Sequence, residues 1–476
     1  MNKLRLFLEN FIVYGLGGII NKIVPLIMVP IVTRLMPSSD YFGISDLSNT
    51  VVQFGSSIAI MGMYDAMYRM FFEKTDDEYK KSVCSTAFVF TLFTSFIVFF
   101  VMILTRSIIA QFFFSDQEYA YVVYLSAIAV LVGGTNSIIS APTRMQNKRT
   151  IYLIANTVSP VLSYSISIPL LLKGYYVVAL PLAAVISGAT METAFGIMNR
   201  KWFNPRKFSK QLLKQLLQIG VPLLPNFLIY WIFNSSDKIM ITNILGIGMA
   251  GIYSVSSKLG HASQLIYIAF AGGWQYFAFS TMNDTDQVKT NSMIFEYLGI
   301  ISFIATSFIC AWSYPIFGLL FTEQYLSGYI AAPYLFLAPL LQMLFQVACN
   351  QFIVIKKTWP NMLILSLGAI FNVILNYMLI PILGIEGASI ATLVGYVISD
   401  VICVIVLSKM KLMIVSEKFV IACISMTFFM VMWRMLVSAN YVAGTIGAVI
   451  LFVFLVYLYS MDVRRLLLII KEEYKK

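Results

Sequence analysis

Long apolar stretches, separated by short polar connections, follow one another along the whole chain. Each stretch runs for about 20 to 25 residues, which allows an α-helix to cross a hydrocarbon core of about 30 Å. The pattern predicts fourteen transmembrane helices, at residues 11–33, 41–66, 83–105, 119–143, 151–172, 175–199, 217–242, 250–281, 292–315, 329–355, 361–383, 386–408, 417–437 and 441–460. The expected fold class is therefore an all-α polytopic membrane protein, with two related six-helix bundles and two further C-terminal helices.

The composition agrees with a chain that resides in a membrane. Hydrophobic residues make up 59% of the 476 positions and charged residues only 12%, whereas a soluble domain is roughly one quarter charged. No basic stretch is interleaved with aromatic residues in a polar segment, so we expect no nucleic-acid partner despite the net charge of +11. The five cysteines show no metal-ligand spacing and the chain has a single histidine, so we expect neither a metal nor another cofactor.

The basic residues alternate between the two sides of the predicted membrane. Connections assigned to the cytoplasm carry most of the 33 lysines and arginines, whereas the opposite side carries only Arg34, Arg106 and Lys173. Because basic residues are retained on the cytoplasmic side, this distribution predicts an even number of spans in the cytoplasmic (inner) membrane, with both termini in the cytoplasm.

The chain divides at its most polar internal connection. We expect an N-terminal six-helix lobe at 1–199, a basic cytoplasmic linker at 200–216, a C-terminal six-helix lobe at 217–412, and helices 13 and 14 with a cytoplasmic tail at 413–476. Short segments recur between the lobes at nearly constant offsets. They are Gly43-Ile44 and Gly251-Ile252, Ile168-Pro169 and Ile380-Pro381, and Val185-Ile186-Ser187 and Val397-Ile398-Ser399. Such repetition is typical of transporters whose substrate path lies between repeated helical units.

Three segments resemble a known family. They are "NFIVYGLGGIINKIVPLIMVPIVTRLMPSSDYFGISDL" from Asn10 to Leu47, the stretch from Gly220 to Trp274 with its Ser236-Asp237-Lys238 and Gly251-Ile252-Tyr253-Ser254, and "FNVILNYMLIPILGIEGASIAT" from Phe371 to Thr392. With these the chain resembles bacterial polysaccharide (O-antigen-type) flippases of the multidrug/oligosaccharidyl-lipid/polysaccharide (MOP) exporter superfamily, over essentially its whole length.

The resemblance implies a V-shaped pair of six-helix bundles around a central cationic cavity. It also implies the substrate: a lipid-linked oligosaccharide, carried on a polyprenyl pyrophosphate, that crosses from the inner to the outer leaflet by alternating access during O-antigen or capsule biosynthesis. The implied partners are this lipid, the bilayer, a coupling ion (H+ or Na+) and polysaccharide-assembly proteins. Such a substrate needs no covalent chemistry, so we expect a transporter and no enzyme.

Basic residues inside predicted spans are the candidates for binding the pyrophosphate. Charge within a membrane is costly and usually functional. Lys22 lies in the middle of the first helix, and either binds substrate or pairs with a neighbouring helix. Pro25 and Pro30 follow it and are candidate gating residues, since each interrupts helical hydrogen bonding. The other candidate basic residues are Lys238, Lys258, which shares a helix face with His261, and Arg434, which either contacts the lipid or reaches the interface.

Acidic residues in or near the spans are candidates for charge balance or ion coupling. Asp237 is expected either to neutralise Lys258 or Lys22 or to bind a coupling cation. Asp65 either guards the cytoplasmic mouth or forms a surface pair with Arg69, four residues away. Glu192 and Asp400 are either protonation sites or partly exposed near the inner interface.

Three alternative functions remain open. A drug or cation antiporter of the same superfamily would favour acidic groups at mid-helix, whereas the deepest charge here is Lys22. A lipid II flippase would differ only in substrate. A membrane polysaccharide polymerase or ligase would need a sizeable outer loop, and the outer connections are short; the D-x-D sequence at Asp284-Thr285-Asp286 lacks the surrounding α/β domain of a glycosyltransferase.

Overall fold

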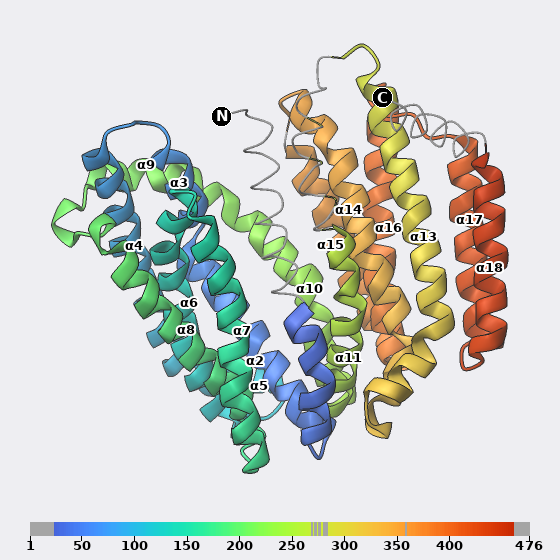
Figure 1. Cartoon of the computed structure of the whole chain (residues 1–476), viewed down its shortest axis with the longest axis horizontal. Coiled ribbons are helices and arrows are strands. Elements are labelled where there is room, and N and C mark those ends of the chain that lie inside the picture. The colour runs from blue at the N-terminus through green and yellow to red at the C-terminus, as the bar shows by residue number, and fades with distance from the viewer. Residues whose placement is uncertain are drawn as a thin grey trace. The chain divides into compact units, whose positions relative to one another are not determined.

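The computed structural model describes residues 23–267, 270, 274, 278, 284–357 and 359–460, and these residues form helices and short connections with no β-strand among them. The chain divides into two units, each described separately below. The first contains Met1–Val255 and Val373–Ala388, and the second contains Ser256–Asn372 and Ser389–Lys476. Figure 1 shows the helices coloured along the chain.

The first unit is built around α6. A helix over Ile23–Leu35 precedes the numbered helices α2 (Ser39–Ile60), α3 (Met63–Phe71), α4 (Asp77–Leu104), α5 (Arg106–Phe114), α6 (Ala120–Met145), α7 (Arg149–Leu172), α8 (Ala179–Asn199), α9 (Lys210–Gly220), α10 (Leu224–Leu245) and the start of α11 (Ile247–Gly260). Helix α6 packs against α2, α4 and α8, and α10 packs against α2 and α5. One apolar core joins α2, α4, α5 and α6, and a second joins α3, α4 and α9.

The predicted span 41–66 is wrong as a single helix, because a break separates α2 from α3. Met61 and Gly62 adopt left-handed backbone conformations, with φ of 49° and 68°. A Cβ added to Gly62 would lie 2.4 Å from the carbonyl oxygen of Gly220 at the end of α9, so only glycine fits this close approach. The two helix ends therefore pack backbone against backbone, and α3 lies against α9 (Figure 1).

The second unit contains long apolar helices packed around α14. Its helices are α13 (Gln287–Leu320), α14 (Ala332–Val354), most of α15 (Trp359–Leu383) and of α16 (Ile385–Lys409), α17 (Glu417–Met432) and α18 (Tyr441–Leu458). Helix α14 is buried along nearly its whole length. The carboxylate of Glu296 on α13 accepts hydrogen bonds from the Ser416 backbone and hydroxyl and from the Tyr459 hydroxyl, at 2.6–3.1 Å. This side chain therefore fixes α13 to the chain segments at the start of α17 and the end of α18.

Eleven helices among the described residues are long and apolar enough to cross a membrane, and they coincide with eleven of the predicted spans. The chain is therefore a multi-pass helical membrane protein. The spans predicted at 11–33 and 250–281 extend into residues outside the described ranges, and α2 carries too many polar residues to qualify by itself. The number fourteen and the lobe boundaries at 199, 216 and 412 remain predictions.

Candidate functional site

A buried ion pair in the first unit joins α2 to α10. The Nζ atom of Lys238 lies 2.5 Å from Oδ2 of Asp46, and the Asp46 side chain is 3% exposed. The hydroxyl of Ser254 on α11 donates to the same carboxylate oxygen at 2.8 Å. A charge placed away from water is stable only when it is paired and hydrogen-bonded, and Asp46 has both kinds of partner.

The neighbouring carboxylate, Asp237, is held by side chains from two other helices. The hydroxyl of Tyr253 on α11 donates to its Oδ2, and the amide of Asn376 on α15 donates to its Oδ1, each at 2.5 Å. Asp237 and Lys238 are adjacent on α10 and point in different directions, so each makes its own contacts. The polar cluster of Asp46, Lys238, Ser254, Asp237, Tyr253 and Asn376 thus connects α2, α10, α11 and α15.

Glycines bring α2 and α11 close enough for these contacts. A Cβ added to Gly43 would lie 2.5 Å from the carbonyl oxygen of Ile247, and one added to Gly251 would lie 2.1 Å from that of Ser39. Small residues allow helix backbones to approach in this way. Gly43 and Gly251 belong to the repeated Gly-Ile segments of the sequence, and Asp46 and Ser254 follow them by three residues each.

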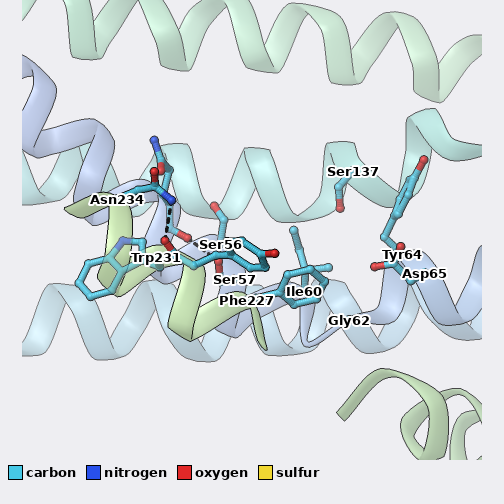
Figure 2. A pocket seen from close by; sticks show the side chains of 12 residues that line it. Ser56, Ser57, Ile60, Gly62, Tyr64, Asp65, Ser137, Phe227, Trp231 and Asn234 are labelled. Carbon is cyan, nitrogen blue, oxygen red and sulfur yellow. Dashed lines mark hydrogen bonds between the residues drawn. The ribbon is translucent and has the colours of Figure 1, made fainter. Parts of the chain in front are cut away.

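Further along α2 and α10, the first unit contains a cavity of about 520 Å³ (Figure 2). Tyr64 and Asp65 on α3 lie at one end and Trp231 and Asn234 on α10 at the other, with the hydroxyls of Ser56, Ser57 and Ser137 between them. The remaining lining residues are Gln53, Ile60, Gly62, Phe227 and Tyr230. We call this the aromatic-hydroxyl pocket.

Two contacts connect this pocket to the body of the unit. The indole nitrogen of Trp231 donates to the Thr50 carbonyl at 3.2 Å, and its ring packs against Phe54 with centroids 4.6 Å apart. Within α10 itself, the amide of Asn234 donates to the Tyr230 carbonyl at 2.7 Å. The aromatic wall is therefore held in place by α2, whereas amide oxygens and hydroxyls from α2, α6 and α10 remain at the pocket surface. Such a lining suits a ligand with apolar faces and many hydroxyl groups.

The sequence predictions fall on different parts of the structure. Asp65 lies in the aromatic-hydroxyl pocket, and the structure shows no ion pair between Asp65 and Arg69, both of which are described. Asp237 and Lys238 lie in the polar cluster. Glu192 is half-buried on α8 and is not among the residues that line the aromatic-hydroxyl pocket. Pro25 and Pro30 lie within the continuous helix Ile23–Leu35.

Other predicted residues lie in the second unit or outside the described residues. Lys22 is outside the described ranges. Lys258 near the end of α11 and His261 in the following 3-10 turn are half-buried, and both belong to the second unit. Arg434 lies in a π-helical turn, Trp433–Val437, that extends α17. Asp400 is buried on α16.

Sequence reasoning missed the partners of the predicted charges. Asp46 lies inside a predicted span, and an acidic residue there is a signal for a basic partner, which Lys238 supplies. Tyr253 and Asn376 are uncharged residues that occur commonly in helices, so they give no such signal. The aromatic residues of the pocket, Phe227, Tyr230 and Trp231, look like any membrane-helix residues until α10 is placed beside α2.

Comparison with solved structures identifies the fold. A structure described as the lipid II flippase MurJ in an inward closed conformation matches with a TM-score of 0.71 and 13% identity, covering 95% of this chain and 99% of that one. An inward-facing multidrug resistance MATE family transporter of the MOP superfamily matches with a TM-score of 0.57 and 15% identity, covering 83% of this chain and 98% of that one. The fold is that of MOP-superfamily transporters.

The family follows from the sequence itself. Residues 31–330 match the family described as "Polysaccharide biosynthesis protein". The chain belongs to this family of polysaccharide biosynthesis proteins within the MOP fold. A comparison with curated protein sequences finds no match.

Proposed function

We propose that the protein is a flippase that moves a polyprenyl-pyrophosphate-linked oligosaccharide across the cytoplasmic membrane by alternating access, for synthesis of a surface polysaccharide such as O-antigen or capsule. The observation that carries the proposal is the aromatic-hydroxyl pocket, which lies among membrane helices of a polysaccharide biosynthesis protein. Aromatic rings cover the apolar faces of sugars, and hydroxyls and amides replace the water that sugar hydroxyls lose on leaving solution.

The pyrophosphate and the prenyl chain of the substrate need separate binding sites. The pyrophosphate requires a cation, and Lys22 and Lys258 remain the proposed ligands for it. Lys238 is already neutralised by Asp46, which favours a role for Lys238 in holding α10 against α2 rather than in binding anions. Arg434 is proposed to contact the prenyl chain near the appended helices. Both termini are proposed to lie in the cytoplasm, as the distribution of lysine and arginine indicates.

Coupling and gating are part of the same proposal. Asp237, Asp65, Glu192 and Asp400 are the proposed sites for charge balance or for the coupling H+ or Na+. Asp237 fits such a role because two neutral hydrogen-bond donors hold it, and the protonation or cation occupancy of a carboxylate would change how strongly they bind. Pro25 and Pro30 are the proposed sites where the first described helix changes shape.

Blocking the aromatic-hydroxyl pocket tests the proposal. Ser57→Trp places a large ring between the aromatic residues of α10 and the serines of α2, and we expect it to stop export while lipid-linked precursor accumulates in the inner leaflet. The matched control is Thr190→Trp on α8. Both hydroxyls donate to the carbonyl four residues earlier at 2.8 Å, and Thr190 is exposed outside the pocket.

Two measurements separate the possible outcomes. Surface polysaccharide is quantified on cells, and lipid-linked oligosaccharide is extracted and quantified from their membranes, with protein amount checked in each strain. Normal polysaccharide export by Ser57→Trp at wild-type protein level contradicts the proposal. Accumulation of a peptidoglycan precursor, with surface polysaccharide intact, assigns the protein to lipid II instead.

A further inference from the structure

The second unit contains a larger and much more apolar cavity. It measures about 610 Å³ and is formed by α13, α14, α16 and α17. Its inner wall consists of Phe295 and Phe303 on α13 and of Leu337, Leu341 and Leu344 on α14, all of them buried. A cavity of this size accommodates a molecule as large as a typical drug.

The cavity has an exposed rim. Val397 and Val401 on α16 and Val420 on α17 line it and are 40–49% exposed, and such apolar side chains on the outside of a membrane helix face lipid. The rim lies between two helices of the same unit, both of them long and apolar enough to span the membrane. A lipophilic molecule dissolved in the bilayer can therefore enter the cavity sideways, without passing through water.

One carboxyl group interrupts the apolar wall. Asp400 on α16 lines the cavity and is only 8% exposed. Within the described part of the chain, neither of its carboxyl oxygens has a hydrogen-bond partner. The other described polar side chains of the lining, on Tyr334, Thr427 and Cys423, do not donate to it, and the Thr427 hydroxyl donates instead to the Cys423 carbonyl at 2.9 Å.

A buried polar group without a partner destabilises a protein, so its retention in the wall of a cavity calls for a ligand that supplies the partner. We propose that this cavity binds a lipophilic amine, whose nitrogen pairs with Asp400 and whose hydrocarbon portion fills the space between α14 and α17. The binding site faces the bilayer and belongs to the second unit alone.

The chemistry of the cavity lining excludes the other obvious classes of ligand. A plain acyl or prenyl chain would fill the cavity and leave Asp400 without a partner. A phosphate or pyrophosphate head group needs a cation to balance its charge, and none of the described residues that line the cavity is basic. An amine satisfies both the apolar wall and the carboxyl group, because its N–H groups donate to the oxygens that the protein leaves unpaired.

This site does not depend on the proposed flippase function, and binding can be measured without transport. Wild-type protein in phosphatidylcholine nanodiscs is titrated with radiolabelled dodecylamine, and binding to empty nanodiscs is subtracted. We expect one saturable site per chain. Asp400→Asn keeps the volume of the side chain and removes its charge, and we expect it to weaken dodecylamine binding by about 10-fold or more, equivalent to about 1.4 kcal/mol. Dodecanol, which has the same chain without the amine, serves as the comparison ligand.

Two variants complete the experiment. Glu417→Gln removes an exposed carboxylate from the first turn of α17, outside the lining, and is expected to leave dodecylamine affinity unchanged. Val394→Trp fills the cavity from α16 and is expected to abolish saturable binding. Equal dodecylamine affinity of wild type and Asp400→Asn overturns the proposal. Equal affinity of the wild type for dodecanol and dodecylamine also overturns it, and assigns the cavity to an uncharged lipid chain.

Discussion

Two buried sites, the polar cluster of the first unit and the apolar cavity of the second, treat their carboxyl groups in opposite ways. In the first unit, Asp46 is paired with Lys238 and Ser254, and Asp237 is held by Tyr253 and Asn376. In the second unit, Asp400 has no hydrogen-bond partner among the described residues and faces an apolar cavity. The same chemical group therefore connects four helices at one site and is available to a ligand at the other, although the second unit also has a paired carboxylate, Glu296.

This comparison distinguishes a buried carboxyl group that supports the fold from one that is proposed to bind a ligand. A buried carboxylate that contacts several helices stabilises their arrangement, and removing one partner leaves an uncompensated charge. A buried carboxyl without partners stabilises nothing, so its presence needs another explanation. Counting charged residues in predicted spans cannot distinguish the two cases, whereas counting their partners can.

The largest loss of stability is expected from removing Lys238, the basic residue of the ion pair with Asp46. Lys238→Met removes the cation that is paired with the buried carboxylate of Asp46, and we expect the protein to lose about 3–5 kcal/mol of stability. Thermal unfolding of purified protein in detergent measures the loss. The double variant Asp46→Asn/Lys238→Met removes both charges and should recover most of it. A double variant no more stable than Lys238→Met would show that the charge pairing is not what holds α2 to α10.

A smaller loss of stability is expected from pushing apart α2 and α11, which contribute Asp46 and Ser254. Gly251→Ala introduces a methyl group where a Cβ would lie 2.1 Å from the Ser39 carbonyl oxygen, and overpacking of this kind costs about 1–3 kcal/mol. The control is Gly318→Ala on α13, where no atom lies within 4 Å of an added Cβ. The control should be neutral or slightly stabilising, because alanine is the better helix former. Equal unfolding temperatures for the two variants would contradict the close approach of α2 and α11.

The smallest change in stability, and the only gain among these predictions, is expected from a substitution at Asp400. Asp400→Leu replaces an unpartnered carboxyl by an apolar group in an apolar wall, and we expect a gain of about 1 kcal/mol. The same unfolding measurement, made without added amine, detects it. Asp46→Leu is the matched substitution in the first unit and should destabilise, since it leaves Lys238 without its carboxylate. Destabilisation by Asp400→Leu as well would mean that both carboxyl groups support the fold.

Much of the fold follows from the sequence because helix length and hydropathy are local properties. Eleven predicted spans coincide with helices that can cross a membrane. The break between α2 and α3 was not predicted, because its cause is the contact between Gly62 and Gly220, which are distant in the chain. A turn of this kind looks, in the sequence, like the interior of a helix with one glycine.

The candidate site was predicted only in part for the same reason. Asp65, Asp237 and Asp400 stand out as charges in apolar surroundings, and the structure places each at a pocket or a polar cluster. Their partners do not stand out, because a tyrosine or an asparagine in a helix is unremarkable until its neighbour is known. Trp231 illustrates the point: its position in the aromatic-hydroxyl pocket depends on Thr50 and Phe54 of a distant helix.

The pairing of Asp46 with Lys238 also has a consequence for how the protein is made. The ribosome reaches Lys238 about 190 residues after Asp46, which corresponds to roughly 10–40 s at translation rates of about 5–20 residues per second. Throughout that interval α2 lacks its Lys238 partner. We therefore expect nascent chains that end before Lys238 to leave α2 accessible from the aqueous side of the translocation channel.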